Sequence, residues 1–387
     1  MKLYKKNKKT LLVFVLISTL MPFMSALAQD ANTATAVVQE NDRESQQNVE
    51  ILTRGEEKGW MLIPFAEYPE YEQLYWGFDL YHYLHYPHLA STRPSLFGLG
   101  GRFGNFDAME FTLTGDIYVR DNDWHLLGKL SLRSKYPLFR DVKPYGISSY
   151  GSSTLYFSNL VSALRVERKI WQSIYLGFGY RIWSGEIEAE NNLFEEWGYL
   201  GTDGGAVSGV ELAFSYDSRD SGFSPLKGSL LGMSYFISKK AVGSDYNYYL
   251  LNLDLRKYFN PRGDHRLAIR MAGEMSRGDV PIFELPDLGG KDGLRALERG
   301  VYIDRNMLSL QSEYGMPLFN RFGIIFFAGA GEVFSSFNDF TIADMNYSIG
   351  GGFRYKLDEG IRSKIHLDFA GGNKNNFNLV FGAFERF

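Results

Sequence analysis

Three histidines lie at intervals of three residues, at His82, His85 and His88, and their ring nitrogens could in principle bind a metal ion. On a β-strand this spacing places successive side chains on alternate faces, so the three rings cannot converge on one ion. The chain has no cysteine, which excludes a disulfide framework, a thiolate nucleophile and Cys-based zinc or iron–sulfur sites. We therefore expect neither a metal site nor a cofactor.

Motifs for catalysis are also missing from the sequence. It contains no GxSxG elbow, no P-loop and no HExxH segment. A lipase needs only a serine, a histidine and a polar residue that orients the histidine, so this alternative stays open, although no local context supports it. We predict that the protein is not an enzyme.

The polar residues belong to a pattern with period two that begins near Trp60 and recurs in short blocks bounded by turn residues. In residues 251–256, 266–274 and 361–369, apolar side chains fall on one face of an extended strand and charged ones on the other. A soluble sandwich alternates in the same way, so the pattern alone does not choose between architectures. The number of strands is more informative.

Sixteen strands can be placed, and an even number suits a closed bacterial barrel with both chain ends in the periplasm. The predicted fold is therefore all-β, a 16-stranded antiparallel transmembrane β-barrel over residues 57–387. The strands are expected near 59–68, 75–86, 95–104, 107–119, 123–136, 153–169, 174–190, 207–218, 228–240, 246–259, 265–277, 306–317, 322–336, 346–357, 361–371 and 377–387.

The predicted connections alternate between short and long. If the first strand runs outward, the periplasmic turns are tight, at 120–123, 260–263 and 358–360. The long connections, near 184–206, 278–305 and 337–345, then lie at the outer surface, as in outer-membrane barrels. Lipid requires apolar side chains on the outer face, because neighbouring strands already pair every backbone group. The charged face then lines a lumen.

The N-terminus predicts export. Five lysines precede the apolar run 11–20, and Ala26 and Ala28 supply a small-x-small cleavage site, so residues 1–28 read as a signal peptide. The alternative is a membrane anchor, but the run is short and Pro22 breaks it. Removal takes away five lysines and no acids, so the net charge falls from −4 to −9, which excludes a basic surface for nucleic acid. Residues 29–56 are polar and predict a short flexible periplasmic tail.

The C-terminal strand resembles the recognition strand at the end of outer-membrane barrels. Its apolar residues, among them Phe381 and the terminal Phe387, share one face, and Gly382 lies five residues before the end. Glu385 departs from the pattern, because an apolar residue is usual there. The alternative is an ordinary edge strand that ends in Phe.

Residues 216–228 resemble the "YDxRDxxxxPxxG" periplasmic turn of the BamA/TamA superfamily, the bacterial surface antigen barrels. The turn falls between the predicted strands 8 and 9. The resemblance extends over most of residues 57–387 and is most specific in 212–387. The residues that match the turn motif are Asp217, Arg219, Asp220, Pro225 and Gly228.

A second stretch, residues 288–318, resembles the sixth surface loop of that family and the strand after it. The resemblance implies that the loop folds back into the lumen and that an arginine, here Arg295, pairs with acids on the inner wall. Alternation leaves Glu313 and Asp368 facing the lumen as candidate partners, whereas Gly329 stands where some relatives have an Asp. Ala296 and Leu297 replace the usual Gly and aromatic residue. The matching loop residues are Gly289, Gly290, Gly293, Gly300, Tyr302 and Asp304.

Members of this family insert barrel proteins or move polypeptides across the membrane by opening the seam between the first and last strands. The chain lacks the POTRA domains of the larger members, so the resemblance implies a short form that works in outer-membrane lipid with outer-membrane or periplasmic partner proteins. Two alternatives remain open. One is a passive or gated, porin-like channel, and the other is a structural subunit of an outer-membrane complex.

Overall fold

A computed structural model describes residues 57–67, 75–85, 93–105, 107–142, 151–290, 293–358, 363–373 and 376–383. The predicted signal peptide with Ala26 and Ala28, the predicted tail at 29–56 and the terminal Phe387 lie outside these residues. The chain divides into two units, Met1–Glu56 and Glu57–Phe387. All strands described below belong to the second unit.

Sixteen strands form one sheet, together with one short α-helix and three turns of 3₁₀ helix. Among the described residues no helix is long and apolar enough to cross a membrane. The elements are β1 (Glu57–Glu67), β2 (Tyr75–His85), β3 (Ser95–Phe103), β4 (Met109–Val119), β5 (Trp124–Val142), β6 (Gly151–Trp171), β7 (Ile174–Ala189), α3 (Leu193–Glu196), β8 (Gly204–Asp217), β9 (Gly228–Ser238), η1 (Lys240–Val242), β10 (Tyr248–Phe259), β11 (Arg266–Gly278), η2 (Ile282–Glu284), β12 (Asn306–Phe319), β13 (Phe322–Phe334), η3 (Ile342–Asp344), β14 (Asn346–Asp358), β15 (Ser363–Gly372) and β16 (Phe377–Ala383).

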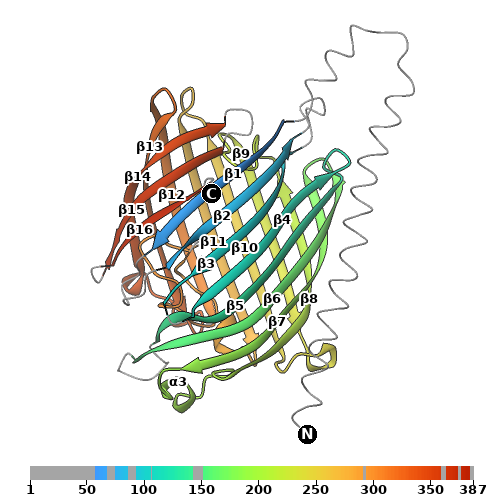
Figure 1. Ribbon diagram of the computed structural model, residues 1–387, viewed down its shortest axis with the longest axis vertical. Helices are drawn as coiled ribbons and strands as arrows, with labels where there is room; N and C mark the ends of the chain where they lie inside the picture. The colour runs from blue at the N-terminus through green and yellow to red at the C-terminus, as the bar shows by residue number, and fades with distance from the viewer. Residues whose placement is uncertain are drawn as a thin grey trace. The chain divides into compact units, whose positions relative to one another are not determined.

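The strands follow one another around a nearly closed barrel in chain order, and each is antiparallel to its neighbours, as predicted (Figure 1). The strand boundaries lie close to their predicted positions except at the end of β5, and the predicted end of the last strand, residues 384–387, lies outside the described residues. Strand β5 continues past the predicted end at residue 136, because the chain passes through a bulge between Arg133 and Tyr136 and then pairs again with β6 up to Val142. This long hairpin projects beyond its neighbours.

The barrel wall closes by hydrogen-bonded ladders everywhere but at one seam. Each consecutive pair from β1 to β16 has a continuous register, whereas in the described part of the chain no register joins β1 to β16. The two strands approach one another without a ladder. The seam therefore leaves backbone donors and acceptors of two edge strands unpaired by sheet formation.

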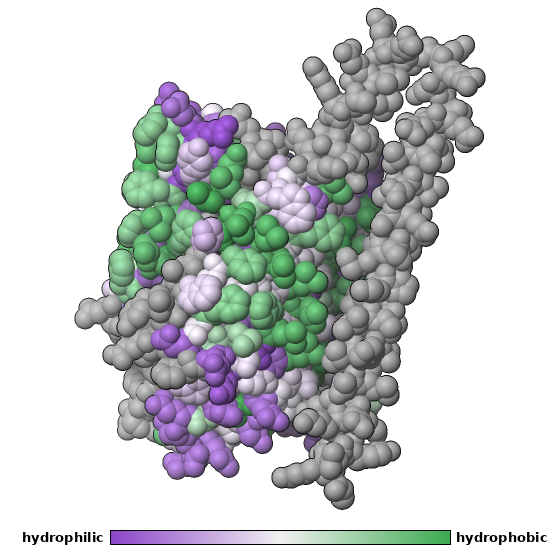
Figure 2. All heavy atoms as spheres, viewed as in Figure 1, coloured by the Kyte–Doolittle hydropathy of each residue, from purple (hydrophilic) through white to green (hydrophobic). Residues whose placement is uncertain are grey.

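The two faces of the wall differ in chemistry, as the alternation predicted. On β12, for example, Leu310 and Tyr314 are exposed on the outer face, while Gln311 and Glu313 are buried inside. Figure 2 shows the outer consequence on one side of the barrel, a band of hydrophobic residues with hydrophilic residues gathered toward both ends. This distribution fits a wall that faces lipid outside and polar groups inside.

Candidate functional site

The segment between β11 and β12, residues 279–305, lies against the inner wall in two places. Its first part packs with the inward side chains of β6 to β10, where Val280, Ile282 and Ile303 join one buried cluster. The ring of Phe283 stacks on Trp183 with centroids 3.9 Å apart. Glu284 accepts hydrogen bonds from Arg181 Nη2 at 2.6 Å and from the hydroxyl of Tyr248 at 3.0 Å.

The second part of this segment packs against β12 to β16. Leu288, Leu294 and Leu297 are buried together with Met307, and Ala296 packs with Ile325, Phe327 and Ala370. The backbone is held as well: Ala296 N donates to Ser348 Oγ at 3.0 Å, and Asn378 Nδ2 donates to the Arg295 carbonyl at 3.1 Å. Residues 279–290 and 293–305 thus contact inward side chains of β6 to β10 and of β12 to β16.

Arg295 lies at the centre of the second contact and is only 2% exposed. Its Nη2 donates to Glu313 Oε2, its Nε lies 3.3 Å from Asp368 Oδ2, and the guanidinium carbon lies 4.2 Å from the ring centroid of Phe327. Both carboxylates are fully buried. The structure therefore brings the three predicted residues together, and we call Arg295, Glu313 and Asp368 the latch.

Two further arginines, which the sequence reasoning missed, share the latch carboxylates. Arg354 Nη1 donates to Asp368 Oδ1 at 2.5 Å and its Nη2 lies 3.9 Å from Glu313, while Arg266 forms an ion pair with Glu313. Both arginines are almost fully buried. Alternation along β11 and β14 could have found them, since both fall on the inward face. Each carboxylate thus has at least two guanidinium partners, which offsets part of its desolvation.

The glycines of the loop motif permit close backbone approaches. A Cβ on Gly293 would meet the Leu288 carbonyl oxygen, and one on Gly289 would meet that of Glu298. Asp287 ties the loop by accepting from Gly289 N at 2.9 Å and Gly300 N at 2.6 Å. Gly290, at φ +78°, accepts from Gly293 N at 3.3 Å.

Tyr302 and Asp304 hold the last part of the loop. The Tyr302 carbonyl accepts from Leu288 N at 3.0 Å, and its hydroxyl accepts from Asn376 Nδ2 at 3.3 Å. Asp304 accepts from Ser335 Oγ at 3.0 Å, and burial raises the pKa of its carboxyl above the ordinary value. These contacts make the motif residues structural parts of the loop.

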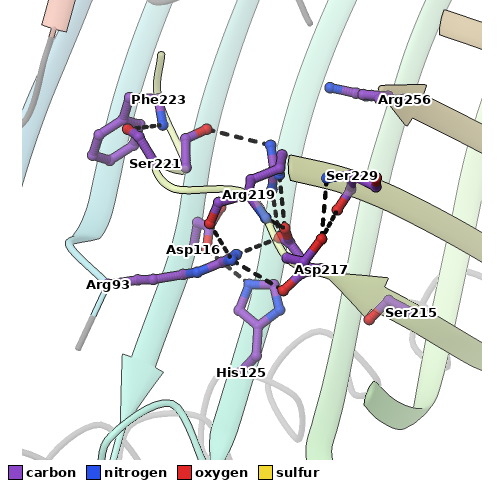
Figure 3. A network of polar contacts seen from close by, with 12 residues as sticks. Arg93, Asp116, His125, Ser215, Asp217, Arg219, Ser221, Phe223, Ser229 and Arg256 are labelled. Atoms are coloured by element: carbon purple, nitrogen blue, oxygen red, sulfur yellow. Dashed lines mark hydrogen bonds and ion pairs between the residues drawn. The ribbon is translucent and has the colours of Figure 1, made fainter. Parts of the chain in front are cut away.

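A second polar network lies in the turn between β8 and β9 (Figure 3). Asp217 accepts from Arg219 Nε at 2.9 Å and Nη2 at 2.7 Å. Asp220 Oδ1 accepts from the backbone of Leu226 at 2.9 Å and of Lys227 at 3.1 Å. Each of the two motif acids therefore fixes a different part of the turn.

Two other residues of this motif shape the backbone. Pro225 is buried. Gly228 has φ +104°, and a Cβ there would also meet the carbonyl oxygen of Ser218. Only glycine adopts this conformation without strain, which explains the glycine at this place in the turn.

Arg93, just before β3, joins this turn to the turn between β4 and β5. It forms an ion pair with Asp217, donates to the carbonyls of Asp217 and Arg219 at 3.3 Å each, and its backbone donates to Asn122 Oδ1 at 2.8 Å. Burial lowers the pKa of Arg93 and of Arg219, but hydrogen bonds to Asp217 raise it by more. The pKa of both arginines therefore lies above the ordinary value. No sequence signal pointed to Arg93.

The C-terminal strand has the predicted faces. Phe377, Leu379 and Phe381 point outward and are 68%, 51% and 44% exposed, whereas a Cβ on the inward Gly382 would lie 3.0 Å from the His366 ring. The terminal Phe387 lies outside the described residues, so its role as an assembly signal stays a prediction.

Among the three histidines, the structure describes the His82 ring on the outer face of β2. That ring stacks on Trp60 with centroids 4.3 Å apart. The side chain of His85 and all of His88 lie outside the described residues. In the described part of the chain no group of three His, Asp or Glu side chains could hold a metal ion.

Solved structures of two proteins share the fold. One is BamA from Haemophilus ducreyi lacking POTRA domains 1–3, at 13% identity and a TM-score of 0.53, covering 85% of this chain and 69% of that one. The other is CdiB from Acinetobacter baumannii, at 10% identity and a TM-score of 0.53, covering 87% of this chain and 67% of that one.

Among curated proteins no sequence matches the chain. Residues 99–379, which hold the latch, the turn between β8 and β9 and all strands from β4 to β15, match the Omp85 superfamily domain. The chain therefore belongs to the Omp85 superfamily of outer-membrane β-barrel proteins.

Proposed function

We propose that the protein acts in the bacterial outer membrane, in the assembly of outer-membrane proteins or the translocation of polypeptides, without catalysing a reaction. Partner proteins supply the periplasmic module. The observation that carries this proposal is the seam between β1 and β16. In the part of the chain that the structure describes, it is the one place in the wall where neighbouring strands lack a ladder.

An unpaired strand edge can receive another extended chain, because its free N–H and C=O groups form main-chain hydrogen bonds with an added strand. The seam also touches the latch, since β16 contributes Asn378 to the Arg295 carbonyl and β15 contributes Asp368. A strand that entered the seam would therefore pair beside β16, which contacts Arg295 of the long loop.

A disulfide across the seam tests the proposal, and the native chain, with no cysteine, has no competing thiol. Cysteines at Met61 or Ile63, which face inward on β1, would be paired in turn with one at Val380 on β16. A matched control joins Ala213 to Ser234, which already face each other across β8 and β9. The measurement is the amount of heat-modifiable outer-membrane protein assembled in cells that depend on the variant.

We expect the seam crosslink to stop assembly and a reductant to restore it, while the crosslink between β8 and β9 has no effect. Full assembly by a chain with a closed seam would contradict the proposal. Affinity purification of the native protein from membranes would then identify the partner, because a protein bound to the barrel should come with it.

A charged cavity favours one alternative, a channel. A cavity of about 370 Å³ lies against β3 to β8 and is lined by Asp116, Lys129, Arg165, Arg181 and Glu211 among others. Conductance in a planar bilayer discriminates between the two functions. A lumen filled by residues 279–305 should conduct poorly, whereas a porin-like channel should show large, steady openings.

A further inference from the structure

A small pocket opens at the periplasmic end of β11 to β15, below the latch. Its volume is about 40 Å³, and Leu226 from the turn between β8 and β9 forms part of its wall. Of the described residues that line it, five are basic and one is acidic: Arg266, Arg321, Arg354, Lys356, Lys364 and Asp264. This local excess of positive charge contrasts with the net charge of −4 of the whole chain.

Glu313 and Asp368 already offset the charge of Arg266 and Arg354, so the positive excess comes mainly from Arg321, Lys356 and Lys364. The acidic residue of the lining, Asp264, neutralises little of this remainder. Asp264 Oδ2 lies 3.5 Å from Lys356 Nζ, and its side chain is 64% exposed. Charges that are this exposed interact weakly, because water screens them. Clefts lined by one sign of charge raise the local concentration of the opposite ion, so the pocket should attract anions from the periplasm.

The inner end of the pocket is rigid. Arg266 and Arg354 are buried, and both are fixed through Glu313, with Asp368 also bound to Arg354. An arginine that is already held in place loses little side-chain entropy when it binds another group. The outer end, at Arg321 and Lys356, is more exposed.

The pocket is small. A cavity needs at least roughly 10–15 Å³ to hold one water, and this one has a volume of about 40 Å³. It therefore suits one small anionic group at a time, such as a side-chain carboxylate.

We propose that this pocket binds side-chain carboxylates of an acidic, extended segment of a periplasmic partner protein. This inference rests on the proposed function, because it names the surface to which a periplasmic partner protein binds. Charge complementarity at one mouth of the barrel would also orient the partner toward the turn at 218–227, which contributes Leu226 to the pocket.

The test uses the full-length barrel purified in detergent and an eight-residue Glu/Gly peptide with an uncharged fluorophore, measured by anisotropy. A Gln/Gly peptide is the probe control. We expect Arg321→Gln combined with Lys356→Gln to weaken binding of the Glu peptide by roughly five- to tenfold at low salt, with a smaller difference at high salt.

The chain offers a matched control at the same mouth. Lys169 is 28% exposed and lies 3.8 Å from Asp123, while Lys356 is 32% exposed and lies 3.5 Å from Asp264. Lys169→Gln removes one charge beside β6, as Lys356→Gln alone removes one beside β14. Compared with that single variant, Lys169→Gln should leave binding within twofold of the wild type.

Three outcomes would overturn the proposal: equal binding of the Glu and Gln peptides, equal weakening by Lys169→Gln, or displacement of the peptide by inorganic phosphate at lower concentrations than by acetate. The last result would assign the pocket to phosphate-bearing groups, such as lipid headgroups. None of these outcomes bears on the seam crosslink, which tests β1 and β16, so failure of this inference can be told apart from failure of the proposed function.

Discussion

Replacing Arg295 should lower the free energy of unfolding of the barrel, and the size of the loss depends on the ion pairs that its neighbours keep. The side chain is 2% exposed, and its partners Glu313 and Asp368 are fully buried. Breaking a buried ion pair costs roughly 3–5 kcal/mol, because one charge stays buried without its partner. After Arg295→Ala, however, Glu313 keeps Arg266 and Arg354, and Asp368 keeps Arg354. We therefore expect a loss at the lower end of that range, about 3 kcal/mol of unfolding free energy.

Removing the shared acid should cost more than removing one arginine. Glu313→Ala leaves three buried guanidinium groups near the single carboxylate of Asp368, so we expect a loss of about 5 kcal/mol. Arg295→Lys keeps the charge but loses the planar fork that reaches two carboxylates, so it should destabilise the barrel less than Arg295→Ala does. The contacts thus predict the largest loss for Glu313→Ala, a smaller one for Arg295→Ala and the smallest for Arg295→Lys. If Arg295 were a loop arginine without buried partners, this order would not be expected.

Urea titration of the purified barrel in detergent, followed by tryptophan fluorescence and by the gel shift on boiling, measures these changes. Arg305→Ala is the matched control, because Arg305 is an exposed arginine of the same segment, and its effect should stay within about 0.5 kcal/mol. A double-mutant cycle of Arg295→Ala with Glu313→Gln or Asp368→Asn should show coupling to at least one acid. Losses below about 1 kcal/mol for Arg295→Ala and no coupling to either acid would refute the latch.

Three more predictions concern the barrel as a whole. The folded protein should migrate anomalously in cold detergent gels and shift on boiling, and recovery in the soluble fraction without a shift would contradict a membrane barrel. Deleting Phe387 should lower the amount assembled in the outer membrane, measured by the heat-modifiable fraction, and normal levels would show that this residue is no signal. Gly228→Ala should lower the thermal stability of the folded barrel by roughly 1–3 kcal/mol because of its φ of +104°, whereas Gly222→Ala, which meets no atom within 4 Å, should change little; equal effects would contradict the strain argument.

The strands could be predicted from the sequence because their signal is local. A wall between lipid and lumen imposes period two on every strand. The outward position of Leu310 and the inward position of Gln311 on β12 can therefore be predicted without knowing which residues they contact. Because each strand pairs with the next in the chain, strand order gave the topology as well. The conformation of a tight turn also depends on neighbouring residues in the chain. Gly228, which has a positive φ, could therefore be recognised as part of a turn from the sequence.

The candidate site was only partly predictable. Alternation placed Glu313 and Asp368 on the inward face, and the family resemblance singled out Arg295, but neither indicates how many charges share one carboxylate. Arg266 and Arg354 reach the same acids from β11 and β14, strands whose spacing around the wall depends on closure of the barrel.

The tertiary structure alone decided the contacts that cross the lumen. Arg93 binds Asp217, 124 residues away along the chain, and Glu284 of the long loop binds Arg181 of β7. Likewise the basic pocket gathers residues from five strands, β11 to β15, and from one distant turn. Period two tells whether a side chain points inward, but the side chain that it meets there depends on the curvature of the sheet and on the path of the loops, which are set by packing of the whole chain.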